Sequence, residues 1–209
     1  MIAIVDYGVG NLFSLQSSLE YIGAKAAVTN SASDLAAADK VILPGVGAFG
    51  DAAEKLRSSG LYETVLDEAR RGKPLMGICL GMQLLFQKSF EFGEHKGLGL
   101  LKGEIRPLAD VVPPGYKIPQ MGWNALRFHG EKHPLFRYVS EGDCVYFVHS
   151  YCAAGCEESL IASVEYGAPV TAAVAKGNVS GCQFHPEKSG DVGLNILRAF
   201  CEMKEGAVC

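Results

Sequence analysis

Residues 75–86 read Leu-Met-Gly-Ile-Cys-Leu-Gly-Met-Gln-Leu-Leu-Phe, an apolar strand pattern that runs through the turn Gly-x-Cys-x-Gly into an amphipathic helix pattern. This order is typical of a nucleophile elbow with cysteine in place of serine. Such a strained turn leaves no room for a Cβ two residues before or after the nucleophile, which explains Gly77 and Gly81. We therefore expect Cys79 at the edge of a sheet, where a helix N-terminus favours its thiolate.

Before this stretch, short apolar runs alternate with helical patterns. After it, the sequence pattern changes. The N-terminal runs, which predict parallel strands with helices on both faces, are 2–5, 26–29, 41–43 and 74–78. Helical spacing of apolar residues over 12–22 predicts a first helix that Asn11 caps and Gly23 ends. From 98 to 175, short runs between glycine and proline turns predict antiparallel strands. The expected fold class is α/β, with a mixed, mainly parallel sheet flanked by helices and an antiparallel extension.

The 209 residues carry a net charge of -4, 48% hydrophobic residues and no cluster of lysine or arginine along one face. A chain of this length fits one compact domain, so we expect a single domain over 1–209 with one active site. The charge pattern gives no footprint for nucleic acid or anionic lipid, and neither partner is expected. No run approaches membrane-spanning length and the first residues do not resemble a secretory signal, so a cytoplasmic location is expected.

The seven cysteines form no C-x-x-C pair that would indicate a disulfide framework or a zinc site. They lie at positions 79, 144, 152, 156, 182, 201 and 209. Cys152 with Cys156 lacks a matching second half. The histidines without a partner at metal-ligand spacing are His95, His129 and His133. We expect no metal and no cofactor, and we discount the glycosylation pattern Asn178-Val179-Ser180 because such tripeptides arise often by chance.

A second motif follows a strand pattern at 181–184 and reads His185-Pro186-Glu187. A cysteine nucleophile needs a base and proton carrier, and His185 has a carboxylate two residues on that can orient its imidazole. Pro186 fixes its own φ and favours extended geometry at His185, so both side chains can face one site. By itself this tripeptide is more often a surface turn. Its pairing with the elbow predicts a triad of Cys79, His185 and Glu187.

The third element of such chemistry is a pair of amides that stabilise the tetrahedral intermediate. We expect one from Leu80, directly after the nucleophile, and another from Val46 or Gly47 in the glycine-rich loop 44–47. This loop lacks the lysine of a P-loop and the spacing of a dinucleotide fingerprint, so phosphate binding is discounted. We expect the loop to rearrange before its amide faces the hole, which would couple the site to a partner.

Six segments make the chain resemble, from end to end, a class I (triad-type) glutamine amidotransferase, and within that class the HisH family of glutaminase subunits of imidazole glycerol phosphate synthase. They are 6–12, 44–49, 77–83, 119–124, 146–151 and 183–189. The resemblance implies a flavodoxin-like fold and hydrolysis of L-glutamine to glutamate and ammonia via a Cys79 thioester. It also implies that ammonia passes to a partner cyclase subunit of (β/α)8 barrel fold. The cyclase would use it to make imidazole glycerol phosphate and aminoimidazole carboxamide ribotide in histidine biosynthesis.

The same resemblance assigns further residues to roles. The residues that it implies for holding the glutamine head group are Gln83, Glu91, His149, Ser150 and Tyr151. The residues that it implies for the cyclase interface are Asn11, Trp123 and Lys188.

Three alternatives stay open at this point. The chain could serve another synthase, such as that of anthranilate, carbamoyl phosphate or pyridoxal phosphate, and partner binding would separate these. It could be a non-glutaminase protein with an elbow cysteine, such as a peptidase or a redox-sensing chaperone, which would not react with a glutamine-mimicking electrophile. It could also be a catalytically idle interaction subunit, which the intact triad disfavours.

Overall fold

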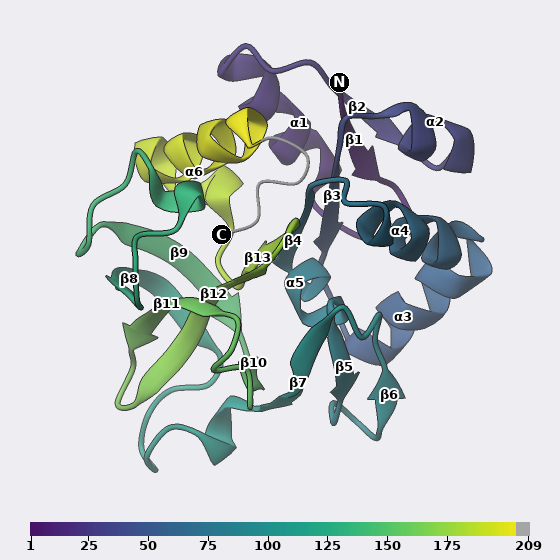
Figure 1. Cartoon of the computed structure of the whole chain (residues 1–209). Coiled ribbons are helices and arrows are strands. Elements are labelled where there is room, and N and C mark those ends of the chain that lie inside the picture. Colours follow the sequence, from purple (N-terminus) through teal and green to yellow (C-terminus); the bar gives the residue numbers. More distant parts are fainter. Residues whose placement is uncertain (204–209) are drawn as a thin grey trace.

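A mixed sheet of nine strands organises residues 1–203, the part of the chain that this computed structural model describes (Figure 1). Its strand order is β2-β1-β3-β4-β13-β12-β11-β8-β9. The strands of the parallel part are β2 (Ala26–Thr29), β1 (Ile2–Val5), β3 (Lys40–Gly45), β4 (Leu75–Cys79) and β13 (Val179–Cys182). The strands of the antiparallel part are β12 (Pro169–Lys176), β11 (Leu160–Glu165), β8 (Gln120–Phe128) and β9 (Cys144–His149). The predicted α/β fold is confirmed, and its antiparallel extension is nearly as large as the parallel part.

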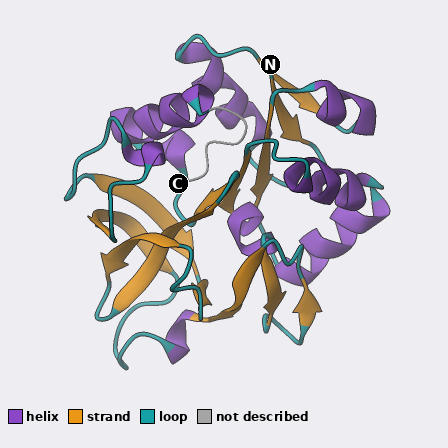
Figure 2. Cartoon of the chain, viewed as in Figure 1, coloured by secondary structure: helices purple, strands orange, loops and turns teal. Residues whose placement is uncertain are grey.

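Helices cover both faces of the parallel part (Figure 2). The helices on one face are α1 (Leu12–Tyr21) and α6 (Gly190–Glu202), and those on the other are α2 (Ala32–Ala37), α3 (Phe49–Ser58) and α4 (Leu61–Arg70). Because successive side chains of a strand point to opposite faces, β1 supplies Ile2 and Ile4 to the first core cluster and Ala3 and Val5 to the second. Burial on both faces explains why these strands read as continuous apolar runs.

A second, smaller sheet follows directly on the elbow and was not predicted as a separate layer. After α5 (Leu80–Leu84), the chain enters a sheet of order β10-β7-β5-β6, at the bottom of the view in Figure 1. Its strands are β5 (Phe86–Ser89), β6 (His95–Lys96), β7 (Leu101–Pro107) and β10 (Tyr151–Ala154). This sheet holds the turn with Glu91 and, through β10, the residue Tyr151.

Three local predictions differ from the structure. Asn11 occupies the N-cap position of α1, but its side chain makes no capping hydrogen bond, so the predicted cap is wrong. The helix after the elbow has five residues only, since β5 begins two residues later. The last strand lies at Val179–Cys182 rather than 181–184, because the chain bends away from the ladder before Pro186. Gly23, with φ +80°, follows the end of α1 as predicted.

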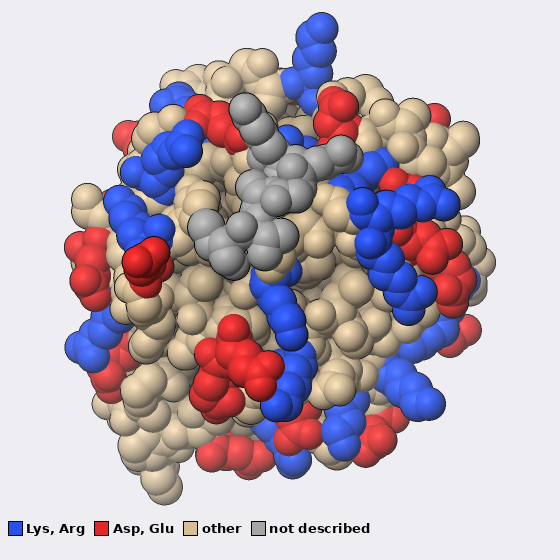
Figure 3. Space-filling view, viewed as in Figure 1, with Lys and Arg blue, Asp and Glu red and all other residues tan. Residues whose placement is uncertain are grey.

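The surface agrees with the charge pattern of the sequence. On the face drawn in Figure 3, basic and acidic side chains are interspersed. No helix within residues 1–203 has both the length and the apolar character needed to cross a membrane. The cytoplasmic location stays a prediction.

Candidate active site

The nucleophile elbow predicted at Cys79 is present at the carboxyl end of β4. Cys79 has φ 54° and ψ -113°, and among the described residues only Phe92 is another non-glycine residue with positive φ. Backbone of this kind costs on the order of 1–3 kcal/mol and persists only where the surrounding structure enforces it. The strain is what turns the chain sharply from strand to helix, leaving the sulfur at the sheet edge.

The two glycines of the elbow are required by close backbone contacts. A Cβ built on Gly77 would lie 2.6 Å from the carbonyl oxygen of Gly81, and one on Gly81 would lie 1.8 Å from the carbonyl oxygen of Leu43. Real Cβ atoms do not approach backbone so closely. The prediction that neither position tolerates a side chain is confirmed, and β3 proves to be the strand that excludes it at Gly81.

His185 and Glu187 form a buried pair beside the elbow. The His185 Nδ1–H donates to Glu187 Oε1 at 2.8 Å, and both side chains are 3% exposed. The backbone of His185 is extended, as predicted from the following proline, and η3 (Pro186–Lys188) carries Glu187 back toward the ring. Ser189 Oγ donates to the His185 carbonyl at 2.7 Å. The imidazole is therefore fixed by its own backbone as well as by its carboxylate.

The charge balance around His185 favours its protonated form. Burial alone would lower the pKa of His185, but the Cys79 sulfur and the Glu187 carboxylate outweigh it and raise this pKa to about 9. Two acidic groups next to one imidazole account for this direction. At neutral pH the ring holds a proton that it can give to a leaving group.

One cleft of about 350 Å³ gathers most of the residues singled out in the sequence. Its lining residues from that set are Val46, Gly47, Cys79, Leu80, Gln83, Glu91, His149, Ser150, Tyr151, His185 and Lys188. Two members of the predicted interface set lie elsewhere. Asn11 lines a very small cavity behind the triad together with Glu187, and Trp123 is 63% exposed on β8. The cleft thus joins the loop after β3, the elbow, the second sheet and the β9–β10 corner.

A chain of side-chain amides connects the second sheet to the sulfur. Gln83 Nε2 donates to Gln183 Oε1 at 2.9 Å and to the Tyr151 carbonyl at 3.1 Å. Gln183 Nε2 in turn lies 3.7 Å from Cys79 Sγ. Sequence reasoning missed Gln183, although it lies only two residues before His185 in the same short segment.

His149 offers an unpaired acceptor near the triad. Its Nδ1–H donates to the Tyr151 carbonyl at 2.8 Å, while Nε2 is buried without a hydrogen-bond partner among the described residues. Burial lowers the pKa of His149 to about 4. The Tyr151 carbonyl opposes this shift in pKa, and the nearby His185 adds to it. The ring is neutral at pH 7, so Nε2 can accept a hydrogen bond.

Glu91 faces the cleft from the turn between β5 and β6. Its Oε2 accepts a hydrogen bond from the Phe49 amide at 2.6 Å. Burial raises the pKa of Glu91, and the Phe49 amide opposes that shift.

Among residues 1–203, no group of three or more histidine, cysteine, aspartate or glutamate side chains is placed to hold a metal ion. The cleft and its border thus bring together a cysteine sulfur, a histidine paired with a carboxylate, and several further polar groups.

Comparison with known proteins agrees with this geometry. Residues 3–203 match the family model "Glutamine amidotransferase class-I". The chain is 54% identical over 206 residues to the imidazole glycerol phosphate synthase subunit HisH of Wolinella succinogenes, covering 97% of this chain and 100% of that protein. It is 52% identical over 203 residues to the subunit of the same name from Bacillus licheniformis, covering 96% and 95%.

Solved structures with low sequence identity share the fold. The structure of PurLQS from Thermotoga maritima has a TM-score of 0.74 at 21% identity, covering 95% of this chain and 96% of that one. A crystal structure of a glutamine amidotransferase has a TM-score of 0.73 at 20% identity, covering 96% and 99%. The family model and the high identity of the curated relatives show that the chain belongs to the class I glutamine amidotransferases and, within them, to the HisH family of imidazole glycerol phosphate synthase subunits.

Proposed function

We propose that the chain is the glutaminase subunit of imidazole glycerol phosphate synthase, hydrolysing L-glutamine to glutamate and supplying the ammonia to a cyclase subunit. The observation that carries this proposal is that Cys79 and His185 line one cleft of about 350 Å³, while Glu187 holds the His185 ring from behind. Membership of the HisH family supports the choice of partner over the synthases of anthranilate, carbamoyl phosphate and pyridoxal phosphate.

The first half of the reaction forms a thioester. The Cys79 sulfur attacks the carboxamide carbon of glutamine, and the carbonyl oxygen becomes an oxyanion that the Leu80 amide and the loop amides at Val46 and Gly47 stabilise. Imidazolium His185 then donates its proton to the amide nitrogen, the C–N bond breaks and ammonia leaves. The raised pKa of His185 suits it to this step, because the proton is present at neutral pH.

The second half returns the enzyme to its starting state. Neutral His185 takes a proton from a water molecule, which attacks the thioester carbon, and the C–S bond breaks to give glutamate and Cys79. Glu187 keeps Nδ1–H directed toward itself and so leaves the other ring nitrogen for the sulfur and the substrate. Glutamine and water supply every atom and proton that the two steps consume, so neither step requires a metal or cofactor.

Recognition of glutamine needs groups for its ammonium, its carboxylate and its amide. The Glu91 carboxylate suits the ammonium by charge. The acceptor His149 Nε2 and the polar groups at Ser150, Tyr151 and Gln83 suit the rest of the head group, since they line the same cleft. We propose these five as the glutamine-binding set.

We propose that the cyclase covers the surface around Asn11, Trp123 and Lys188. Trp123 packs edge-on against Tyr146 with ring centroids 4.9 Å apart, and Lys188 Nζ lies 5.9 Å from the centre of the same ring. Met121, on the same strand as Trp123, is also exposed. An exposed aromatic and apolar group beside a catalytic cleft is typical of a protein interface. A partner seated there could receive ammonia before water protonates it.

The test is glutamate release from glutamine by the purified chain, alone and then with the cyclase subunit and its nucleotide. Activity that rises with the partner and disappears in a Cys79→Ala variant is the expected result. No glutamate under any condition would leave the fold without this function and would favour a peptidase or redox reading of the elbow cysteine.

A further inference from the structure

The loop segment 44–48, which comprises the last two residues of β3 and the three residues before α3, is held at its start by a buried tyrosine. Tyr7 Oη donates to the Pro44 carbonyl at 2.8 Å, and the Tyr7 side chain belongs to a residue that is 5% exposed. A Cβ on Gly45 would lie 2.8 Å from this hydroxyl and 2.9 Å from the Gly81 amide. The tyrosine hydroxyl therefore fixes the loop directly against the elbow.

The same loop is held at its end by Glu91. The residue before α3, Ala48, has no side chain that can cap the helix, and the Phe49 amide instead donates to Glu91 Oε2 at 2.6 Å. The turn that carries Glu91 is itself fixed, because the Glu91 amide donates to buried Ser89 Oγ at 3.1 Å. His95 packs on the first turn of α3, where a Cβ on Gly50 would lie 2.7 Å from its ring.

Between these two anchors the backbone is free to turn. Val46 is 42% exposed and Gly47 has φ +95°, which only glycine adopts readily. Neither amide donates a hydrogen bond to another residue within 1–203. The loop therefore has two fixed ends and, between them, two amides, those of Val46 and Gly47, that are available to an oxyanion.

We propose that Tyr7 and Glu91 are positioning residues that hold the two ends of loop 44–48 and so determine where its free amides lie. The inference rests on the proposed function and goes beyond it. Binding of glutamine in the cleft does not require either residue to hold the loop. Glu91 then has two tasks: one oxygen holds the Phe49 amide while the other is left for the substrate ammonium. Substrate binding and the oxyanion loop thus share one carboxylate.

The chemistry of the two anchors suits these tasks. Burial, and then the neighbouring Cys79, raises the pKa of Tyr7 far above its ordinary value, so the hydroxyl remains a donor throughout the working range of pH. A hydrogen bond to a charged acceptor is stronger than a neutral one, which favours the carboxylate at the Phe49 amide. A neutral carboxamide could still accept that bond, whereas a methyl group could not.

The Tyr7 anchor is tested with Tyr7→Phe, which removes one hydroxyl and keeps the buried ring. We expect the ratio of glutaminase kcat with and without the cyclase and its nucleotide to fall by at least about three-fold, because the loop is no longer fixed in one position. Tyr62→Phe is the matched control, since Tyr62 Oη also donates to a backbone carbonyl, that of Gly97, at 2.8 Å. Its ratio should not change.

Alkylation of Cys79 by iodoacetamide distinguishes an effect on the loop from an effect on the reactivity of the sulfur, because that reaction forms no oxyanion. The rate should be the same in Tyr7→Phe and wild type. An unchanged kcat ratio, or an alkylation rate that changes as much as kcat does, would overturn the role of Tyr7.

The Glu91 anchor is tested by comparing Glu91→Gln with Glu91→Ala. Both variants lose the charge for the ammonium, so both should raise KM for glutamine. Only the alanine variant loses the acceptor at the Phe49 amide, and its kcat should lie about ten-fold below that of the glutamine variant. Equal kcat values would overturn the role of Glu91 in the loop. Absence of glutaminase activity in the wild type with its cyclase would instead refute the proposed function.

Discussion

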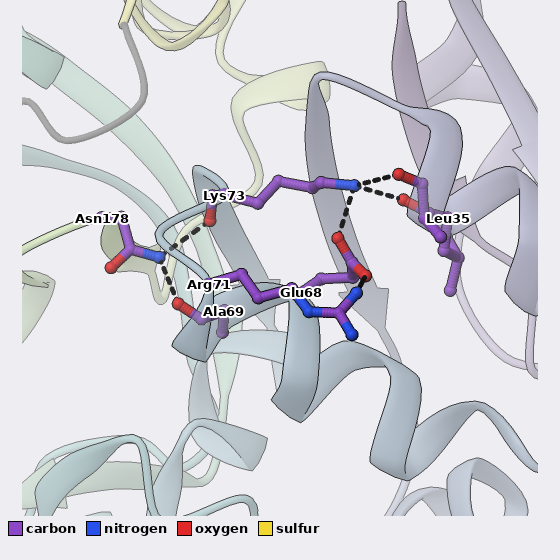
Figure 4. A network of polar contacts seen from close by, with 7 residues as sticks. Leu35, Glu68, Ala69, Arg71, Lys73 and Asn178 are labelled. Carbon is purple, nitrogen blue, oxygen red and sulfur yellow. Dashed lines mark hydrogen bonds and ion pairs between the residues drawn. The ribbon is translucent and has the colours of Figure 1, made fainter.

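Strands β4 and β13 lie side by side and have a polar cluster at each end. At their amino ends, Lys73 and Asn178 join Glu68 and Arg71 in the structural cluster (Figure 4). At their carboxyl ends lie Cys79, His185 and Glu187, the proposed triad, which we call the catalytic cluster. The two clusters differ in how completely their polar atoms are paired.

In the structural cluster the charged groups and the Asn178 amide nitrogen have hydrogen-bond or ion-pair partners. Lys73 Nζ lies 2.6 Å from Glu68 Oε2 and donates to the carbonyls of Leu35 and Ala36 at 2.7 and 2.8 Å, which occupies all three of its protons. Glu68 Oε1 also pairs with Arg71 at 2.8 Å. Asn178 Nδ2 donates to two carbonyls, at 2.8 Å each. The cluster ties α2, α4 and the hairpin before β13 together.

In the catalytic cluster the pairing is incomplete and the backbone is strained. Glu187 Oε2, and His149 Nε2 in the adjoining cleft, are buried without partners within residues 1–203, and Cys79 has positive φ. Local rules of this kind are broken mainly at functional sites, where the rest of the fold compensates. We infer that the amino ends of β4 and β13 stabilise the fold while their carboxyl ends are kept reactive at a cost in stability.

The largest expected effect is that of Cys79→Gly, which should separate activity from stability. Loss of the nucleophile should lower glutaminase kcat by at least about 1,000-fold, or about 4 kcal/mol of barrier. Glycine tolerates the φ of 54°, so the free energy of unfolding should rise by about 1 kcal/mol. Urea unfolding and glutamate release measure the two quantities. A destabilised, active variant would contradict the difference between the clusters.

Lys73→Met should have the reverse profile. It removes the buried cation beside the buried Glu68 carboxylate and leaves only the exposed Arg71, so we expect a loss of about 3–5 kcal/mol in the free energy of unfolding. kcat and KM of the folded enzyme should be unchanged. Arg71→Ala is the control, because this side chain is 70% exposed and its pair should contribute less than about 1 kcal/mol. Equal losses of unfolding free energy in the two variants would mean that burial of an ion pair does not determine how much the pair stabilises the fold.

Asn178→Ala should show a smaller effect of the same kind. Removal of the side chain leaves the Lys73 carbonyl without a donor, while the Ala69 carbonyl keeps the Gly72 amide at 3.1 Å, and the change should cost about 1–3 kcal/mol. The turn before β13 should then open first, and hydrogen exchange at Val179 and Ser180 should rise. Exchange that is unchanged there would show that Asn178 does not hold this turn.

The smallest expected effect concerns pH and His149. The ordinary pKa of histidine is 6.5 and that of folded His149 is about 4, so between these values the unfolded state binds more protons. Stability should therefore fall as pH drops from 6.5 through 4, on the order of 1–3 kcal/mol. His149→Gln should flatten this part of the profile and His129→Gln should not. An acid profile that His149→Gln leaves unaltered would show that His149 is not the group that titrates.

The catalytic end was more predictable from the sequence than the structural end. Gly77 and Gly81 are local to Cys79, and a short motif can report local backbone geometry. The structural cluster joins residues more than a hundred positions apart, such as Lys73 and Asn178, and their pattern in the sequence is that of scattered polar residues. Asn178 had stood out only as a discounted glycosylation pattern.

Tyr7 and Gln183 escaped prediction for a related reason. Both lie in segments that carry the family resemblance, 6–12 and 183–189, but their roles depend on which strands become neighbours across the sheet. Tyr7 reaches Pro44 because β1 pairs with β3, and Gln183 reaches the elbow because β13 pairs with β4. Strand order is a global property that periodicity along the chain does not report.

The most direct test of the contrast is covalent labelling with a glutamine-mimicking electrophile, read by intact and peptide mass spectrometry. The account predicts one adduct per chain, on Cys79, in the wild type and in the folded fraction of Lys73→Met, and none in Cys79→Ala. Absence of labelling in the wild type with its cyclase bound, or an adduct on another cysteine, would contradict the assignment of the carboxyl ends of β4 and β13 as the site of glutamine hydrolysis.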